Sequence, residues 1–370
     1  MKIAIIGSRG YPYVYSGYET FIAEVAPRLV QQGIEVHIYC HKNLFKEKPP
    51  IVNGVHLHYI SSIKSKSLSQ YTNSFLSTIH ALFKNYDLLL YVNSANGIWG
   101  PLTKLFRKKT AINVDGLEWL RPKWKGLGAK VFYFSSKMAT KWMNYIITDA
   151  EAMRQIYLQQ FNTDSTVIAY GANIRYSNNI SLINKWSLEK DEYYLIVGRL
   201  IPDNNAVLII EEFIQSNSLK KLVVVGDVPY NDSYAGHVKA IKDNRLLFTG
   251  YVKNQDELAE LYHNCFAYFH GHEYGGTNPT LLKALAYGCC PIALDTIFSR
   301  EVLNNEQYGL YFTKEKENIK NLIHSIELNN DKIKTIKEKS RNRIIENYTW
   351  EKITEQYVNL IKNAINKTHS

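Results

Sequence analysis

The sequence is poor in cysteine and has no long hydrophobic run. Only four of its 370 residues are cysteines, and none belongs to a Cys-x-x-Cys pair. This excludes a zinc knuckle or a disulfide framework, and we expect buried, reduced thiols. The longest apolar stretches, such as residues 3–6 and 222–225, have the length of strands and fall short of the ~20 residues of a membrane-spanning helix. Met1 and Lys2 lead directly into a strand-like segment and not into a signal peptide, which predicts a cytoplasmic protein.

Two common nucleotide-binding motifs are also missing. The loop after the first apolar run, GSRG at residues 7–10, is not Gly-x-Gly-x-x-Gly. The second predicted strand ends at Cys40 and His41 and lacks the acidic residue that would bind a ribose. Both features disfavour a nicotinamide cofactor. The chain contains no Gly-x4-Gly-Lys-Ser/Thr loop, which excludes nucleotide hydrolysis of the P-loop type.

Acidic residues are scarce in the first half of the chain. Residues 1–180 contain 21 Lys and Arg against 10 Asp and Glu, whereas the remainder contains 23 against 24. The excess is densest at residues 107–109 and 121–130. A one-sided basic field predicts an anionic partner, such as a membrane surface or a phosphorylated substrate. No motif of nucleic-acid-binding proteins accompanies the charge, so nucleic acid is disfavoured. A solvated basic surface without a partner is the alternative.

Apolar runs and amphipathic stretches alternate along most of the chain, which predicts parallel α/β architecture. The alternation stops at residues 170–190, which are polar and rich in asparagine. We therefore predict two Rossmann-like domains, residues 1–172 and 186–349, joined by a linker at 173–185. The predicted strands are residues 2–7, 36–40, 87–92, 111–114, 145–148, 193–197, 222–225, 246–249, 267–269 and 291–294, and the predicted helices are residues 20–32, 69–84, 127–143, 150–161, 205–215, 255–264, 279–287, a stretch from 316 onward, and 350–365.

The loop DGLEW at residues 115–119 follows one of these strands. Ligands of open α/β sheets bind at the carboxyl ends of the strands, so such loops are candidate sites. The carboxylates of Asp115 and Glu118 can accept hydrogen bonds from sugar hydroxyls, and the ring of Trp119 can stack on a pyranose. The alternative is structural, with Asp115 as the N-cap of a helix and Trp119 buried.

A second candidate loop, HGHEYGGTNP, spans residues 270–279. Asn278 suits the N-cap of a helix and the following proline suits its first position. The glycine pair Gly275 and Gly276 lets the backbone approach a ligand, and free amides at a helix N-terminus suit a diphosphate. His270 and His272 could ligate zinc, but no third ligand accompanies them. Arg199 leaves the first strand of the second half and could pair with the same phosphate.

Seven segments together resemble the family-four retaining glycosyltransferases of GT-B fold, in particular bacterial rhamnosyltransferase-type members. The resemblance covers essentially the whole chain. It implies two Rossmann-like domains facing across a cleft, with a final helix, residues 350–370, that packs back onto the first domain. The segments are GSRGYPYVYSGYETF, INVDGLEW, AYGAN, IVGRLIPDNN, VVGDVPY, FTGYV and GHEYGGTNPTLLKALAYG.

The resemblance also implies roles for individual residues. Arg199 would meet the donor diphosphate and Asp115 would lie near the transferred sugar, so these two are the predicted catalytic residues. The loop from Gly10 to Gly17 would approach donor and acceptor, and Val252 would flank the base. The predicted donor-binding residues are Gly17, Arg199, Val252, His272, Glu273, Gly275, Gly276, Thr277, Asn278 and Lys283, and the predicted acceptor-binding residues are Tyr15, Glu19, Glu118 and Trp119.

Two positions depart from the family pattern. The family has a glutamate, seven residues and a second glutamate that usually holds the ribose, but this chain has Gly275 and Lys283 there. The family often carries a phosphate-binding lysine shortly after the Gly-Arg pair, whereas this chain has DNN at residues 203–205. Either Lys283 supplies phosphate charge or the donor is held differently.

The resemblance implies a retaining hexosyltransferase of cell-surface polysaccharide synthesis, acting at the inner face of the plasma membrane. The expected donor is a nucleotide-sugar, with dTDP-rhamnose as the specific expectation, and the acceptor is a glycan or a lipid-diphosphate-linked glycan. We expect no metal and no cofactor, because the leaving diphosphate would be stabilised by Arg199 and helix amides. The alternatives are a sugar-nucleotide epimerase of the same fold and a non-catalytic nucleotide-sugar-binding subunit, the latter suggested by Lys283.

Overall fold

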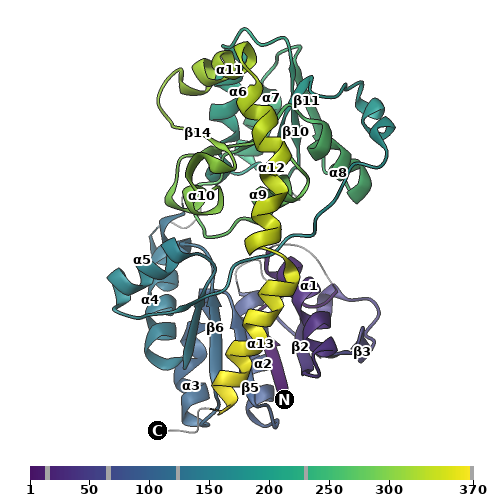
Figure 1. Cartoon of the computed structure of the whole chain (residues 1–370). Coiled ribbons are helices and arrows are strands. Elements are labelled where there is room, and N and C mark those ends of the chain that lie inside the picture. Colours follow the sequence, from purple (N-terminus) through teal and green to yellow (C-terminus); the bar gives the residue numbers. More distant parts are fainter. Residues whose placement is uncertain (13–16, 64–67, 122–125, 229–231, 367–370) are drawn as a thin grey trace. The chain divides into compact units, whose positions relative to one another are not determined.

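The computed structural model describes residues 1–12, 17–63, 68–121, 126–228 and 232–366. The chain forms two compact units: Met1–Tyr170 together with Trp350–Ser370, and Gly171–Thr349. Each unit is a sheet covered by helices (Figure 1). The α/β class with two parallel-sheet domains is therefore as the sequence predicts. Tyr15, a predicted acceptor-binding residue, lies outside the described residues.

The first unit contains an eight-stranded sheet of order β3-β4-β2-β1-β5-β6-β7-β8. All neighbouring strands are parallel except β3 and β4, which are antiparallel. The central strands are continuous apolar runs without alternation, as expected for a parallel sheet covered on both faces. The strands are β1 (Lys2–Ile6), β2 (Glu35–His41), β3 (Ile51–Val52), β4 (Val55–Ile60), β5 (Leu88–Val92), β6 (Thr110–Val114), β7 (Tyr145–Thr148) and β8 (Thr166–Val167).

The helices of the first unit include one from the end of the chain. Helix α13 (Trp350–Asn366) packs along α1 (Gly17–Gln31), and the two lie side by side in Figure 1. Tyr357 of α13 accepts a hydrogen bond of 2.8 Å from the amide of Asn113, and its ring lies 5.0 Å from that of Phe21. These buried contacts fix the final helix to the carboxyl half of β6 and to α1. The other helices are α2 (Ser69–Leu82), α3 (Gly100–Leu105), α4 (Leu127–Trp142) and α5 (Glu151–Phe161).

The second unit contains a six-stranded, entirely parallel sheet of order β11-β10-β9-β12-β13-β14. Its core is one cluster of buried side chains that includes Tyr194, Phe213, Phe269 and Phe312. The strands are β9 (Tyr193–Val197), β10 (Lys221–Val225), β11 (Leu246–Gly250), β12 (Ala267–His270), β13 (Pro291–Leu294) and β14 (Leu310–Phe312), and the helices are α6 (Ala206–Ile214), α7 (Ser233–Ala240), α8 (Gln255–Asn264), α9 (Pro279–Ala286), α10 (Ile297–Val302), α11 (Asn318–Leu328) and α12 (Asp331–Asn347).

The segment at residues 173–185 is ordered against the second unit. It includes most of a 3-10 helix, η4 (Ile180–Trp186), which packs on α8. The buried carboxylate of Glu260 on α8 accepts hydrogen bonds from the backbone amides of Asn178, at 2.8 Å, and Asn179, at 3.0 Å. These hydrogen bonds to a charged group hold the backbone of residues 178 and 179 against α8. The segment therefore belongs to the second unit, which begins at Gly171.

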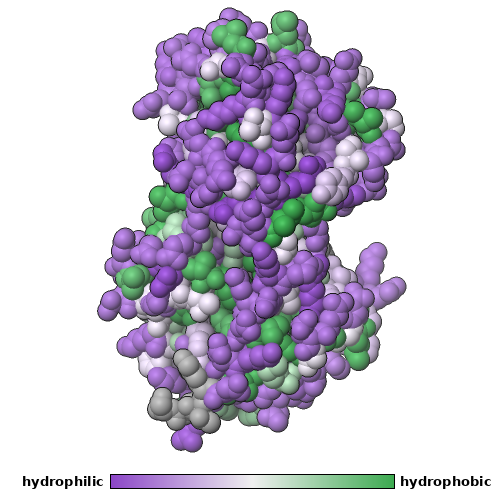
Figure 2. All heavy atoms as spheres, viewed as in Figure 1, coloured by the Kyte–Doolittle hydropathy of each residue, from purple (hydrophilic) through white to green (hydrophobic). Residues whose placement is uncertain are grey.

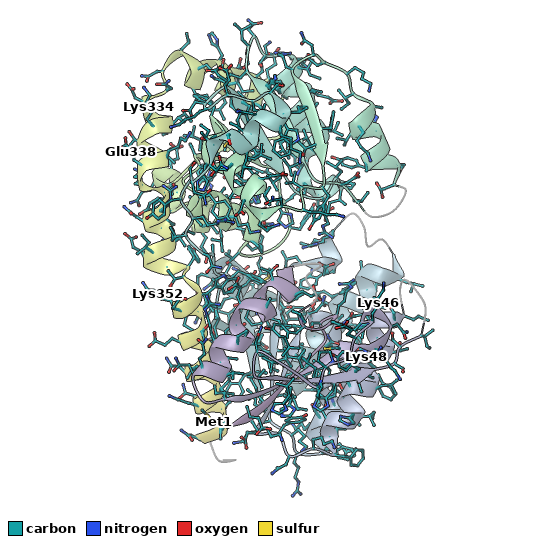
Figure 3. All side chains as sticks on the ribbon, turned by 90° about the vertical axis from the view of Figure 1, so that its right-hand side faces the viewer. Met1, Lys46, Lys48, Lys334, Glu338 and Lys352 are labelled. Atoms are coloured by element: carbon teal, nitrogen blue, oxygen red, sulfur yellow. The ribbon has the colours of Figure 1, made fainter. Side chains whose placement is uncertain are left out.

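The face drawn in Figure 2 is mostly hydrophilic. On the face drawn in Figure 2, hydrophobic residues form separate patches within a hydrophilic surface. Figure 3 shows Lys334 and Glu338 pointing away from α12, and Lys352 pointing away from α13, which marks the solvent-facing sides of these helices. Among the helices of the described residues, none has both the length and the apolar character that a bilayer span requires. All four cysteines are free and buried.

Candidate active site

In the second unit, the loops after β9 and β12 meet at one edge of the sheet, because these two strands are neighbours. Asn204 joins the loops: its amide donates to the carbonyl of Arg199 at 2.8 Å, and its Oδ1 lies 2.9 Å from Nδ1 of His272. Asn205 adds a hydrogen bond of 2.7 Å to the carbonyl of Gly271. The loop that carries Arg199 is therefore held against the loop that carries the glycine pair.

Arg199 is exposed at this edge. Its guanidinium forms no ion pair or hydrogen bond with any residue that the structure describes. The backbone of Arg199 is held in place by Asn204. A planar guanidinium on such a held backbone is suited to bind a phosphate through two parallel hydrogen bonds. The backbone around it is tightly packed: a Cβ on Gly226, whose φ is +127°, would lie 1.9 Å from the carbonyl oxygen of Gly198. Glycine is therefore required at position 226 to bring the end of β10 against this loop.

The turn before α9 has the geometry that the sequence predicts. Asn278 is the N-cap: its Oδ1 accepts from the backbone amide of Thr280 at 2.9 Å, and Pro279 begins the helix. Gly275 has a φ of +136°, a conformation that L side chains rarely adopt. Since the Asn278 side chain is used in the cap, this turn offers a ligand its backbone amides and the positive end of the helix dipole.

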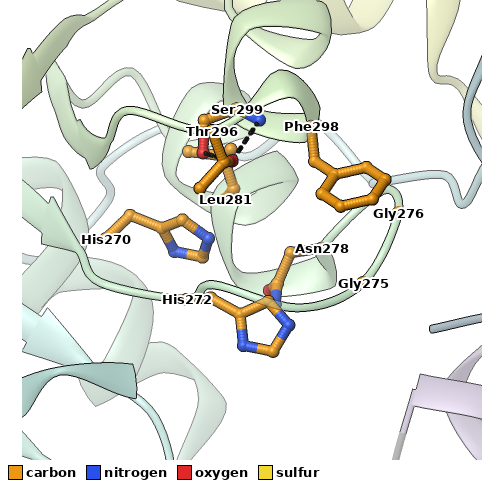
Figure 4. A pocket seen from close by; sticks show the side chains of 9 residues that line it. All are labelled: His270, His272, Gly275, Gly276, Asn278, Leu281, Thr296, Phe298 and Ser299. Atoms are coloured by element: carbon orange, nitrogen blue, oxygen red, sulfur yellow. Dashed lines mark hydrogen bonds between the residues drawn. The ribbon is translucent and has the colours of Figure 1, made fainter. Parts of the chain in front are cut away.

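A pocket opens beside this turn, at the start of α9 (Figure 4). Its far wall is the start of α10, where Thr296 Oγ1 accepts a hydrogen bond of 3.0 Å from the backbone amide of Ser299. His270 is fully buried, which lowers the pKa of its imidazole to about 3 and keeps the ring neutral at physiological pH. The pocket is lined by His270, His272, Gly275, Gly276, Asn278, Leu281, Thr296, Phe298 and Ser299.

The other predicted donor-binding residues lie around the same edge. Glu273 is paired with Lys314, which follows β14, at 2.6 Å. Val252 and Thr277 are buried, Val252 just after the end of β11. Lys283 is partly buried on the second turn of α9. All of these side chains come from the carboxyl-end loops or from α9, so the second unit alone brings together most of the predicted donor site.

In the first unit, two aspartates stand side by side at the carboxyl edge of the sheet. Asp115 follows β6 and Asp149 follows β7, and the last residues of these strands, Val114 and Thr148, are paired in register. Tyr170 donates a hydrogen bond of 2.8 Å to Oδ2 of Asp115. The hydroxyl of Tyr18, in the first turn of α1, accepts one of 3.2 Å from the backbone amide of Asp115.

The electrostatics of Asp115 are dominated by burial. Burial raises the pKa of this carboxyl, and the nearby charge of Glu118 raises it further. The hydrogen bond that Tyr170 donates, the positive charge of Arg121 and a side-chain hydrogen bond shared with Asp149 act in the opposite direction and lower the pKa. The result is a carboxyl whose pKa lies above its usual range, which makes it a stronger proton acceptor than an exposed aspartate.

The structural alternative for Asp115 is wrong. The short 3-10 helix after it, η3 (Glu118–Leu120), has Leu117 at its N-cap and no side-chain capping bond. The carboxylate is instead oriented by Tyr170. The alternative for Trp119 is met only in part: the side chain is partly buried, and its ring packs edge-on against Tyr157 and Phe161, at centroid distances of 6.2 and 6.0 Å.

The remaining predicted residues of the first unit have local partners. Glu19 is buried, and its Oε1 accepts a hydrogen bond of 2.8 Å from the backbone amide of Arg9. This contact ties the first turn of α1 to the loop after β1, and Gly17 is the first residue of that helix. Glu118 is paired with Arg121 at 3.1 Å.

The sequence reasoning missed three residues around Asp115: Tyr18, Asp149 and Tyr170. Asp149 carried a usable signal, because it follows a predicted strand directly, as Asp115 does. Tyr18 and Tyr170 carried none, since they lie 97 and 55 residues from Asp115 in the chain.

Two family models match the chain. Residues 179–348 match the model described as glycosyl transferases group 1, and residues 85–173 match a domain of unknown function, DUF1972. The first match covers nearly the whole second unit, including the Arg199 loop and α9. The second unit therefore resembles a glycosyl transferases group 1 domain over nearly its whole length.

Curated relatives are distant but similar in length. The chain is 21% identical to a probable sucrose-phosphate synthase of Thermosipho melanesiensis, over 94% of this chain and 91% of that one. It is 25% identical to the N-acetylgalactosamine-N,N'-diacetylbacillosaminyl-diphospho-undecaprenol 4-alpha-N-acetylgalactosaminyltransferase of Campylobacter jejuni, over 35% of each chain. Together with the family match, these relatives support a glycosyltransferase.

Solved structures establish the fold over the full length. The sucrose-phosphate synthase of Thermosynechococcus elongatus superposes with a TM-score of 0.84 and 18% identity, over 99% of this chain and 100% of that one. The Anabaena protein HepE, in complex with UDP-glucose, superposes with a TM-score of 0.77 and 15% identity, over 98% and 100%. The chain has the GT-B fold, as the resemblance implied.

Proposed function

We propose that this chain, a glycosyltransferase whose second unit resembles a glycosyl transferases group 1 domain, transfers a sugar with retention from a nucleoside-diphosphate donor. The observation that carries the proposal is that the loop of Arg199, whose guanidinium has no partner among the residues that the structure describes, is held against the loop with the Gly275–Asn278 turn at one end of the second sheet. The Anabaena protein of the same fold binds UDP-glucose, which supports a nucleotide-sugar as the donor class.

The chemistry follows from charge. As the acceptor hydroxyl forms its bond to the sugar and the bond between sugar and diphosphate breaks, negative charge develops on the oxygens of the leaving diphosphate. A fixed guanidinium, the backbone amides of the glycine pair before α9 and the positive end of the α9 dipole stabilise that charge without reorganisation, which is commonly the largest single contribution to catalysis. Asp115 accepts hydrogen bonds from hydroxyls of the bound sugar, and its raised pKa makes it a strong acceptor.

The specific donor we propose is dTDP-rhamnose, and its support is the set of rhamnosyltransferase-type segments in the sequence. The family's ribose-binding glutamate is replaced by Lys283 on α9. A lysine close to the anion-binding turn adds positive charge where a carboxylate would repel a diphosphate. We propose that Lys283 contributes to holding the donor's phosphates.

We propose that the acceptor is a glycan on a lipid diphosphate at the inner face of the plasma membrane. The Campylobacter relative acts on a diphospho-undecaprenol-linked sugar, as its name states. One face of α4 combines the exposed apolar side chains of Leu127, Val131 and Phe134 with exposed lysines, among them Lys130 and Lys137. A basic helix with a hydrophobic stripe is suited to lie on an anionic bilayer.

A donor screen tests the function. The purified chain is incubated with dTDP-, UDP- and GDP-sugars, with and without membrane-extracted lipid-diphosphate glycans, and the released nucleotide and the glycan product are measured. We expect acceptor-dependent release of dTDP from dTDP-rhamnose and an extended glycan. A new sugar nucleotide formed without acceptor would instead identify an epimerase. Tight nucleotide binding with neither transfer nor hydrolysis would identify a non-catalytic subunit.

A further inference from the structure

A cluster of imidazoles lies in the first unit, away from the candidate active site. His37 on β2 and His56 on β4 are paired in register, and their rings stack with centroids 4.5 Å apart. Glu35 begins β2 on the same face as His37, and its Oε1 lies 2.8 Å from Nε2 of that histidine. One ligand atom from each of these three residues lies within 4.8 Å of the others.

We propose that Glu35, His37 and His56 form a binding site for a divalent transition-metal ion such as Zn²⁺. Two imidazoles and one carboxylate are a ligand set that zinc uses with an open fourth position. Tetrahedral zinc with Zn–N bonds of about 2.1 Å holds its ligand atoms about 3.4 Å apart, so the three ligand atoms must move closer together. The rings of His37 and His56 are stacked at an interplanar angle of 15°, and they must tilt out of this stack before both lone pairs point at one ion. Glu35 is exposed and His56 partly exposed, which gives the ion a path from solvent.

The hydrogen bonds behind His37 provide the outer support that metal-binding histidines usually have. Nδ1 of His37 lies 2.9 Å from Nε2 of His58, and the hydroxyl of Tyr86 lies 3.3 Å from the same nitrogen. When His37 carries its proton on Nδ1, it donates to His58 and turns the lone pair of Nε2 toward Glu35. In that tautomer a lone pair faces a carboxylate, an arrangement that a cation between them stabilises. In the other tautomer the proton is on Nε2, which then donates a hydrogen bond to Oε1 of Glu35. This tautomer is the one expected without a metal ion.

Lys2 is the competitor for this site. Its Nζ lies 2.9 Å from Oε1 of Glu35, and both side chains reach solvent, with exposed fractions of 37% and 46%. An exposed ion pair of this kind contributes little stability, so a metal ion can displace the lysine at low cost. The competition predicts that removal of Lys2 strengthens metal binding, an effect that a merely structural histidine stack would not produce.

The site lies at the opposite edge of the sheet from Asp115. Lys2 and Glu35 are the first residues of the paired strands β1 and β2, whereas Asp115 follows the last residue of β6. Parallel strands place all their amino ends on one edge and all their carboxyl ends on the other. Metal binding can therefore be tested separately from sugar transfer.

The test is calorimetric titration of Zn²⁺ into the full chain at pH 7.5, above the ordinary histidine pKa of about 6.5. We expect one ion per chain, at least a tenfold loss of affinity in His56→Ala, and a severalfold gain in Lys2→Ala. His324→Ala, which removes an exposed histidine of α11, is the matched control and should bind as the parent does. No binding by the parent, or equal affinity in His56→Ala, overturns the proposal.

Thermal unfolding provides a second readout that does not depend on heats of binding. A ligand that binds the folded state raises the melting temperature with its concentration. Zinc should therefore raise the melting temperature of the parent and of His324→Ala, and should raise that of His56→Ala clearly less at the same zinc concentration. An equal zinc-induced rise in His56→Ala would place the ion elsewhere, for example on the buried thiols, and would overturn the assignment.

Discussion

The phenol of Tyr170 donates a hydrogen bond of 2.8 Å to the carboxylate of Asp115, at the carboxyl edge of the first sheet. Burial raises the pKa of both groups, so the phenol stays protonated and can only donate its hydrogen toward Asp115. The bond lowers the pKa of Asp115 and partly offsets the effect of burial. Tyr170 is therefore a positioning residue that favours the ionised form of Asp115 and fixes the orientation of its carboxylate.

Tyr170→Phe should shift the acid limb of the pH profile. Without the hydrogen bond the pKa of Asp115 rises, so activity that requires the ionised carboxylate is lost at higher pH than in the parent. A hydrogen bond to a charged group is worth about 1.5–3 kcal/mol, which corresponds to about one to two pH units. The measurement is kcat/KM against pH. Tyr91→Phe, which removes a buried phenol bonded to Thr78 and not to Asp115, is the control. An acid limb that stays in place would contradict the role of Tyr170.

Arg199→Ala should lower turnover by roughly 10²–10³, the loss expected when one group that stabilises charge in the transition state is removed. Arg199→Lys keeps the positive charge but lacks the planar guanidinium, so its turnover should lie between that of the parent and that of Arg199→Ala. Folding should be unaffected, because the side chain is exposed. Arg154→Ala, which breaks an exposed ion pair with Asp164, controls for general effects of losing an arginine. Turnover of Arg199→Ala within a few-fold of the parent would remove Arg199 from the mechanism.

Gly276→Val should weaken nucleotide binding. The branched side chain would occupy the space beside the turn amides, where backbone must approach the diphosphate. Titration calorimetry with the nucleoside diphosphate measures the loss. Gly236→Ala is the control, since a Cβ at this exposed position of α7 meets nothing within 4 Å. If Gly276→Val binds with the parent's affinity, the turn does not contact the ligand.

The architecture was predictable because its signals are local. The buried strands are short apolar runs, and the turn before α9 is marked by Asn278 and Pro279, which the structure confirms as N-cap and first helical residue. Strand β4 was missed because its sequence, VHLHYI, alternates histidine with apolar residues and lacks the continuous run of its neighbours. The rings of His56 and His58 stack on that of His37 in the neighbouring strand β2. This contact between strands cannot be read from the sequence of β4 alone.

The environment of Asp115 could be predicted only in part. Because Asp115 directly follows a predicted strand, the sequence places it at the carboxyl end of the first sheet. The same reasoning, applied to the predicted strand at residues 145–148, would have identified Asp149. The hydrogen bond with Tyr170 could not be predicted, because the two residues are 55 positions apart in the chain. They meet only after β8, which precedes Tyr170, has paired with β7 in the sheet. Long-range partners of a single side chain depend on the sheet order, which the sequence does not state.

Asp115→Asn should separate two roles of this residue. The amide keeps an oxygen that accepts hydrogen bonds, so if Asp115 contacts the sugar, KM for the donor should rise while kcat changes by less than about tenfold. If Asp115 instead takes the acceptor proton, transfer should fall by ~10²–10⁴-fold while slow donor hydrolysis persists. We expect the first pattern. Asp115→Ala that transfers at the parent's rate per folded molecule would exclude both roles.

Reversing two charges on α4 should detach the chain from anionic vesicles. Lys130 and Lys137 lie on the face of α4 that also exposes Leu127 and Phe134, at 81% and 56%. Each lysine near an anionic surface contributes ~1 kcal/mol, attenuated by salt, so Lys130→Glu with Lys137→Glu should reduce binding at least tenfold. The measurement is co-sedimentation with vesicles that contain an anionic lipid, at rising salt concentrations.

The matched control for this experiment is Lys332→Glu with Lys334→Glu on α12, which changes the net charge equally on an exposed helix of the second unit. The control should bind vesicles as the parent does, because its α4 surface is unchanged and only the net charge of the chain is lowered. If both double variants lose binding equally, attraction is a property of total charge and α4 is not the docking surface. If the parent sediments equally with neutral vesicles, the charge is not used for docking and a soluble acceptor replaces the lipid-linked one.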